Sequence, residues 1–188
     1  MKLRTLIVFL LPLVSLLSGC AGINPNNNVG LVTTDFLMQR GDCEGARNTA
    51  EPHAQHGEPW AQYRLGMIAI DQRCPKGPDA LPWLMKAATF RAETPWEKGN
   101  SLSLGPTGYF NTRASSSNAA MALGKIFTAN GYPAMNWYWI QRAASQYALD
   151  EKDGDDLRLM AQELGKAVPA EDQKRISNHW DTEQPWHK

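Results

Sequence analysis

Apolar positions along the chain follow two different patterns. The first is a single run over residues 6–17, which only one Pro and one Ser interrupt. The second begins at about residue 33, where the sequence predicts a series of helices, and Pro59 and Pro133 stand where two of them would begin. Because Pro has a fixed φ and no backbone N–H, it is favoured at the first position of a helix. Most of the chain is therefore predicted to be helical.

Within the helical part, one order of residues occurs twice. The segment 61–68 lines up with the segment 119–126, and each copy contains Leu followed by Gly at the same place. After each Gly, at nearly the same distance, a Trp opens a further segment that contains two adjacent Ala. The repeated positions are Leu65, Gly66, Trp83, Ala87 and Ala88 in the first copy, and Leu123, Gly124, Trp139, Ala143 and Ala144 in the second.

The repeated Gly indicates that two helices approach each other closely. Gly in the middle of a helix costs about 1 kcal/mol relative to Ala. Its presence at the same place in both copies predicts a contact in which only a hydrogen atom fits. The adjacent Ala residues would supply a matching small surface on the next helix, and the Trp would fill the larger space beside it. Such a helix pair cannot bury its apolar face alone and must pack on its neighbours.

This order of residues resembles the Sel-one-like repeat, a relative of the tetratricopeptide repeat that is built from two antiparallel helices. The segment 41–57 resembles the second helix of an earlier unit, and residues 155–180 resemble a degenerate last unit. The resemblance implies an all-α fold, a short right-handed α-solenoid of two and a half to three antiparallel helix pairs, over residues 33–180. Residues 181–188 would form a C-terminal tail.

The spacing of the two copies departs from this family. The Leu-Gly motifs at Gly66 and Gly124 lie farther apart than one ordinary repeat of this family would place them. We expect the surplus to form one long inserted loop at about 92–117, since loops of such length are often functional. It contains residue types that are enriched at the energetic centres of interfaces, namely Trp96, Tyr109, Phe110 and Arg113. These residues are predicted to bind a partner, or else to fold back and anchor the loop on the helices.

The apolar run at residues 6–17 follows Lys2 and Arg4, as in a signal peptide, and is too short to span a membrane. The residues after it, Leu-Ser-Gly-Cys at 17–20, resemble the lipobox of bacterial lipoproteins. The resemblance implies cleavage after residue 19 and a lipid anchor on Cys20, followed by a flexible tether at 20–32. With Ala21 behind the Cys, it favours the outer membrane of a Gram-negative bacterium, facing the periplasm. The alternative is a buried Cys20 that follows an ordinary signal peptide.

Charge and cysteine content narrow the function classes further. The chain has 19 basic and 19 acidic residues, and removal of residues 1–19 leaves 17 basic and 19 acidic residues. This balance argues against a nucleic-acid partner. Once Cys20 carries lipid, Cys43 and Cys74 remain, and two cysteines in an oxidising compartment most simply form a disulfide. A reactive or metal-binding thiol pair is the alternative, but the C-x-x-C spacing is absent.

No set of residues predicts catalysis, and we expect neither an enzyme nor a cofactor. His53 and His56 are three residues apart, which could place two imidazoles near one metal ion, but no H-E-x-x-H motif or third ligand accompanies them. The serine-nucleophile signatures G-x-S-x-G and S-x-x-K do not occur. No catalytic residue and no metal ligand is therefore predicted.

The expected function is that of a protein-protein interaction module. Short repeat lipoproteins of this kind resemble the periplasmic immunity proteins that neutralise antibacterial effectors of type VI secretion, including phospholipases. The resemblance therefore implies a toxin as the protein partner, with the membrane reached through the lipid anchor only. One alternative is an envelope scaffold or assembly lipoprotein for a secretion, pilus or polysaccharide machine. A minor alternative is a cell-wall or lactam hydrolase.

Overall fold

The computed structural model describes residues 28–75, 79–90, 105–146 and 152–182. These residues form eight helices and no strand, which confirms the prediction of an all-α fold. None of the helices in these four ranges combines the length and the apolar character needed to cross a membrane. The helices are α2 (Asn28–Gln39), α3 (Cys43–Gln55), α4 (Pro59–Ile70), α5 (Ala80–Thr89), α6 (Gly105–Ala129), α7 (Pro133–Ala144), α8 (Lys152–Lys166) and α9 (Ala170–Thr182).

Proline and glycine mark several of the helix boundaries. Pro59 and Pro133 occupy the first turns of α4 and α7, as the sequence predicts. Gly41, Gly57 and Gly131 follow α2, α3 and α6, and each has a positive φ, between 76° and 89°. Because a positive φ is a conformation that side chains disfavour, Gly at these three places lets each helix end in a tight turn.

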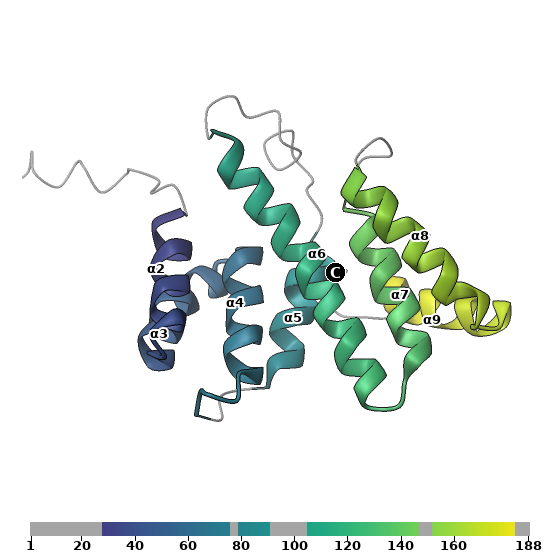
Figure 1. The fold of residues 1–188 in the computed structure, drawn as a ribbon, viewed down its shortest axis with the longest axis horizontal. Helices are drawn as coiled ribbons and strands as arrows, with labels where there is room; N and C mark the ends of the chain where they lie inside the picture. The colour runs from purple at the N-terminus through teal and green to yellow at the C-terminus, as the bar shows by residue number, and fades with distance from the viewer. Residues whose placement is uncertain (1–27, 76–78, 91–104, 147–151, 183–188) are drawn as a thin grey trace, which may run out of the picture.

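From α2 to α8, helices that are consecutive in the chain pack against each other, whereas α9 packs mainly against α7 (Figure 1). The row begins with α2 and α3 at one end and finishes with α7, α8 and α9 at the other. Some helices that are not consecutive in the chain are also in contact. The most extensive of these contacts is between α4 and α6, which α5 separates in the chain. The contact between α4 and α6 places side chains from distant parts of the sequence on one surface.

The core consists of two clusters of buried apolar side chains. The first lies between α3 and α4 and is covered by α2, and its buried residues are Ala46, Ala50, Ala54, Trp60, Ala61, Leu65 and Ile68. The second joins α5 to α8, and its members include Leu84, Ala87, Ala88, Ala119, Ala120, Leu123, Trp139, Ala143 and Ala144. Small Ala side chains dominate both clusters, so the helices can approach one another closely.

The repeated glycines lie at helix contacts, in agreement with the close approach that the sequence predicts. A Cβ added to Gly66 would lie only 2.5 Å from Cγ of Leu84 on α5, and one added to Gly124 would collide with the side chain of Asn136 on α7. The facing residues are thus Leu84 and Asn136, and not the adjacent Ala pairs that we expected. The Ala pairs are instead buried among the other side chains of the second cluster.

The two repeated tryptophans have different surroundings. Trp139 is fully buried, and its ring lies 5.3 Å from the ring of Trp180 on α9. Trp83 is half-buried against the first cluster, and Nζ of Lys86 lies 4.8 Å from the centre of its ring. The two copies of the pattern therefore share their order of residues but not the full environment of each side chain.

A disulfide joins Cys43 to Cys74, the pairing that the sequence predicts. Cys43 is buried at the first position of α3, and Cys74 lies in the segment that follows α4. The two cysteines are 31 positions apart, and the segment between them contains all of α3 and α4. The bridge therefore ties the two ends of the first core cluster together.

Three predicted boundaries are wrong. Helix α2 begins at Asn28, so the last part of the segment 20–32 is helical and the helical region begins before residue 33. The reason is that Leu31, Leu37 and Met38 on α2 pack against the first cluster. Without this helix, that side of the cluster would be uncovered.

Helix α6 begins at Gly105, so residues 105–117 of the predicted 92–117 loop are helical as well. Ser115, Ser116 and Ser117 are buried on this helix, where their small side chains fit between neighbouring helices. At the other end of the chain, α9 extends to Thr182 and so includes the start of the predicted 181–188 tail.

Candidate functional site

The predicted site residues are only partly within the described residues. Cys20 and Trp96 lie outside them. Tyr109 and Phe110 lie on the first turns of α6, where the described structure covers the backbone but not the side chains. Arg113 lies one turn further along α6 and is half-buried. Of the four predicted partner-binding residues, Arg113 alone therefore has a described side chain.

A hollow of about 250 Å³ lies between α4 and α6. Its walls are mostly apolar, and the side chains that form them are Tyr63, Met67, Ile70, Met121, Ala122 and Ile126. Asn118 and Lys125 on α6 add the polar part of its lining. Sequence reasoning missed this hollow, because it depends on two helices that a third helix separates in the chain.

The spacing of residues on α4 explains why one helix serves both the core and this hollow. Leu65 and Ile68 point into the first core cluster, whereas Tyr63, Met67 and Ile70 follow one another at the spacing of a different helix face. Ile70 remains 42% exposed. Helix α4 therefore has more apolar surface than its packing uses, which is a signal that the sequence does contain.

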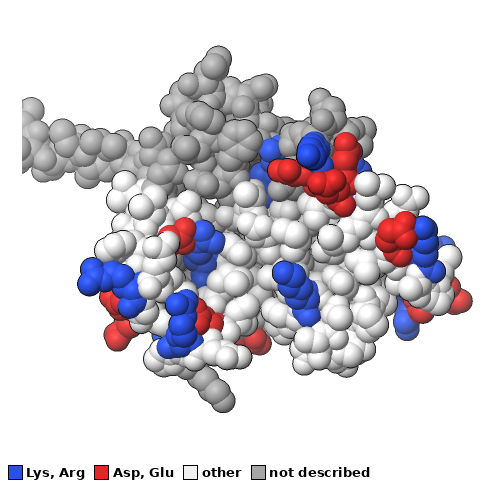
Figure 2. All heavy atoms as spheres, in the orientation of Figure 1, with Lys and Arg blue, Asp and Glu red and all other residues white. Residues whose placement is uncertain are grey.

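One charged group near the hollow, Arg64, is paired, and Lys125 in its lining is exposed. Arg64 on α4 forms a bidentate ion pair with Asp35 on α2, with Nη2 of Arg64 2.7 Å from Oδ2 of Asp35. The same guanidinium lies 5.0 Å from the centre of the Tyr63 ring. Over the face shown in Figure 2, most basic groups lie beside acidic ones, one basic group near the middle stands by itself, and wide uncharged areas separate them. The charged residue in the lining of the hollow is Lys125.

A second, wider hollow of about 730 Å³ lies among α7, α8 and α9. Trp137, Ala144 and Ala161 are its apolar part, and Gln141, Arg158 and Gln173 are among its polar residues. Two of these polar groups are already bound. Nε2 of Gln173 donates to the backbone oxygens of Gly165 and Val168, both at 2.9 Å, and Arg158 is paired with Asp155. Gln173 therefore ties α9 to the end of α8, whereas the Arg158–Asp155 pair lies within α8.

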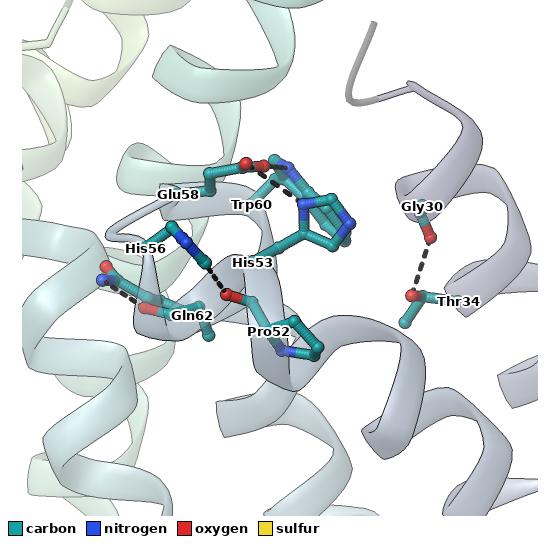
Figure 3. Close-up of polar contacts among 9 residues, drawn as sticks. Gly30, Thr34, Pro52, His53, His56, Glu58, Trp60 and Gln62 are labelled. Atoms are coloured by element: carbon teal, nitrogen blue, oxygen red, sulfur yellow. Dashed lines mark hydrogen bonds and ion pairs between the residues drawn. The ribbon is translucent and has the colours of Figure 1, made fainter. Parts of the chain in front are cut away.

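The two histidines that could have held a metal do not converge (Figure 3). Nδ1 of His53 lies 3.1 Å from Oε1 of Glu58, whose other oxygen accepts a hydrogen bond from Nε1 of Trp60. Nδ1 of His56 instead lies 2.6 Å from the backbone oxygen of Pro52. Within the described ranges, no three His, Cys, Asp or Glu side chains are placed to hold a metal ion. The His53–Glu58–Trp60 contacts join the end of α3 to the start of α4.

Arg142 is a buried charged residue that sequence reasoning missed. It is 7% exposed, and its guanidinium donates to the backbone oxygens of Ala88 at 3.4 Å and Thr89 at 3.1 Å. Nε2 of Gln146 donates to the oxygen of Phe90, which follows α5. A cation at the C-terminus of a helix satisfies its unpaired carbonyls and is favoured by the helix dipole. Arg142 of α7 and Gln146, which follows it, therefore hold the end of α5.

One carboxyl group has a clearly shifted pKa. Hydrogen bonds from the Arg73 side chain and backbone lower the pKa of Asp71 from 3.8 to about 2. The guanidinium lies 2.6 Å from the Asp71 carboxylate at the end of α4. This contact organises the turn that leads to Cys74 and lies apart from both hollows.

Comparisons with known proteins do not assign the chain to a family. No family model, no curated protein and no solved structure matches the chain. The resemblance to Sel-one-like repeats therefore depends on the repeated Leu-Gly, Trp and Ala-Ala positions alone. The function has to be argued from the surfaces described above.

Proposed function

We propose that the chain is a protein-binding module, anchored to the outer membrane through lipid on Cys20, whose helix pairs are arranged as a short right-handed α-solenoid. The observation that carries this proposal is the open apolar hollow between α4 and α6. Its occupant is a side chain or a helix edge of a protein partner. The partner therefore contacts the first helices of two successive pairs.

The chemistry of the hollow suits a protein partner. Met67 and Met121 contribute flexible, polarisable side chains that adapt to another apolar surface. An apolar centre beside polar residues such as Asn118 and Lys125 is the usual composition of an interface. The volume of about 250 Å³ is below the range of roughly 300 to 1,000 Å³ that is usual for small-molecule sites. These features favour protein binding over a small ligand.

Three features support the solenoid arrangement. Helices α2 to α8 pack in chain order, α4 also packs against α6, and Gly66 and Gly124 each face the helix that follows their own. In a stack of antiparallel pairs, the first helices of successive pairs form one continuous surface. The hollow between α4 and α6 would then be part of that surface.

The proposed partner class is a toxin delivered by type VI secretion, which the module neutralises in the periplasm. The apolar hollow supports a protein partner in general, and the resemblance to small immunity lipoproteins points to the toxin. Deletion of the gene should make cells sensitive to sister cells that carry the effector encoded next to it. If the deletion strain competes as well as its parent, the immunity role is wrong. Capture of envelope-machine components by the purified chain would then favour the scaffold role.

The role of the hollow is tested by two matched substitutions. Ile70→Glu places a charge at the hollow, and Leu159→Glu places the same charge at an exposed apolar position on α8. We expect Ile70→Glu to weaken binding of the partner at least tenfold, about 1.4 kcal/mol, by isothermal titration calorimetry. Leu159→Glu should bind like the wild-type chain. Equal affinities of the two variants would show that the partner binds elsewhere.

A further inference from the structure

Helix α2 presents an apolar stripe that the rest of the described chain leaves uncovered. Its members are Val29, Val32 and Phe36, which are 69%, 64% and 52% exposed. Spacings of three and four residues place them on one face of the helix. Single exposed apolar residues are common on protein surfaces, but three on one face of a 12-residue helix form a surface that needs a partner.

The opposite face holds α2 firmly on the protein. Leu31 and Leu37 pack against the first core cluster, and the ion pair between Asp35 and Arg64 joins α2 to α4. Gly30 lies so close to His53 and Trp60 that an added Cβ would be 3.0 Å from the imidazole (Figure 3). The orientation of α2 is therefore set by the core, and its apolar stripe faces away from the protein as a consequence of that packing.

The charges around the stripe are compatible with lipid headgroups. Asp35 is the sole acidic residue of α2, and Arg64 pairs with it. Arg40, just beyond the end of α2, lies with its guanidinium 5.4 Å from the centre of the Phe36 ring. A helix that lies on a membrane surface combines an apolar face with basic residues that contact the phosphates. The α2 stripe has the apolar face, and Arg40 supplies one such basic residue beside it.

The position of α2 in the sequence brings it near a bilayer. Only a short segment separates Cys20 from Asn28, where α2 begins. Even fully extended, this segment spans at most about 28 Å. We therefore infer that α2 lies along the membrane surface, with Val29, Val32 and Phe36 among the lipid headgroups. This inference rests on the lipid anchor in the proposed function.

The contact would give the protein a defined orientation on the membrane. A lipid on Cys20 would hold the chain near the bilayer, but by itself it would not set which helix faces the membrane. A second contact through α2 fixes which surface of the helices faces the periplasm, since α2 is joined to α4 through Asp35 and Arg64. It also strengthens binding, because two membrane signals hold a protein more stably than one.

The experiment uses the mature, lipidated chain in vesicles of phosphatidylethanolamine and phosphatidylglycerol. A nitroxide is attached to Val32→Cys on α2, and a matched one to Leu159→Cys on α8, which is 60% exposed. Collisions with oxygen, which concentrates in lipid, are compared with collisions with a water-soluble nickel complex. We expect the oxygen-to-nickel ratio at position 32 to exceed that at position 159 several-fold. Adding Phe36→Asp should lower the ratio at position 32.

The other outcomes overturn the inference. Equal ratios at the two positions mean that α2 faces water. Spin-spin broadening at position 32 that increases with protein density means that a second copy covers the stripe. Mass spectrometry of Cys20 tests the anchor separately. If Cys20 carries no lipid, a ratio that stays high in the unlipidated chain supports the α2 surface and rejects the anchor, whereas an equal ratio rejects both.

Discussion

At the scale of single residues, Gly66 shows how a local cost supports a tertiary contact. Its place in the middle of α4 is unfavourable for helix formation, yet any larger residue would meet the Leu84 side chain of α5. Both residues are buried, so neither can move into solvent to relieve the contact. Gly66 therefore allows α4 and α5 to approach as closely as they do at this point.

Gly66→Ala should destabilise the protein. The substitution gains roughly 0.5 to 1 kcal/mol of helix propensity, but forcing a methyl group against Leu84 costs about 1 to 3 kcal/mol. We expect a lower free energy of unfolding in urea. The control is the same substitution in a Leu84→Ala background, where the methyl group has room and should be neutral or stabilising. An equal loss in both backgrounds would show that the contact with Leu84 is not the cause.

Asp71 contributes stability over a defined range of pH. Because its pKa is lowered from 3.8 to about 2 by Arg73, the contribution is present above the unfolded value and disappears as the pH falls through that interval. Asp71→Asn should therefore lower the urea midpoint near neutral pH, and the difference from the wild-type chain should vanish on acidification to about pH 2. Arg73→Gln should have a similar but smaller effect, because the backbone N–H of residue 73 still donates to Asp71, and the double variant should resemble Asp71→Asn. A difference that persists at low pH would exclude the ion pair as its source.

At the scale of elements, the disulfide and the helix ends determine how α3, α4 and α5 are held. The Cys43–Cys74 bridge spans two helices, and Arg142 and Gln146 bind the carbonyl groups at the end of α5. These connections act at helix termini, where the backbone has no partner within its own helix. The positions of α3, α4 and α5 relative to their neighbours are thus held at the helix ends as well as through their apolar faces.

Replacing both Cys43 and Cys74 with Ser should lower the free energy of unfolding by about 3 to 4 kcal/mol, since a loop of this length loses that much entropy of the unfolded chain when it is closed. Urea unfolding with and without a reductant measures the effect. The reductant should destabilise the wild-type chain and leave the double variant unchanged. Equal stabilities of the oxidised wild-type chain and the double variant would contradict the expectation.

At the scale of the whole molecule, the helices depend mainly on their neighbours in the chain. The first core cluster involves α2, α3 and α4, and the second involves α5 to α8, with contacts between α4 and α5 joining the two. In such an arrangement, the loss of stability at one end need not spread evenly to the other. The two ends of the molecule can therefore respond differently to the same change.

Reduction of the disulfide should thus have a local effect on hydrogen exchange. We expect faster amide exchange in α3 and α4, with a smaller change in α7 and α8, because the bridge closes the segment that contains α3 and α4. Mass spectrometry of peptides from each helix measures the difference. The double Cys→Ser variant should exchange like the reduced wild-type chain. A uniform increase over all helices would mean that the two clusters unfold as a single unit.

Predictions from the sequence succeeded where a residue acts on its own backbone. Pro59 and Pro133 marked the starts of α4 and α7, because the ring of Pro favours that position whatever lies around it. The starts of α2 and α6 were missed, since Asn28, Gly30 and the three serines at 115–117 are weak helix formers, and the wide spacing of the Leu-Gly motifs placed residues 92–117 in a loop. Packing of Leu31 and burial of the serines override that preference.

The candidate sites also depend on contacts that the sequence does not show. Of the four interface-type residues that stood out in the sequence, Arg113 has a described side chain and does not line the hollow between α4 and α6. Met67, Ile70 and Met121, which do line it, carry no motif. Likewise, the sequence shows that α2 contains many apolar residues, but it does not show which of them face away from the core.

By itself, the sequence predicted the helical class, the helix starts at Pro59 and Pro133, and the pairing of Cys43 with Cys74 once Cys20 is set aside for lipid. Each of these follows from local backbone preference or from simple elimination. Only the tertiary structure decided that Gly66 faces Leu84, that α4 and α6 enclose a hollow, and that Val29, Val32 and Phe36 stay exposed. The physical reason is that such contacts depend on the distances and rotations between helices, which many side chains set together.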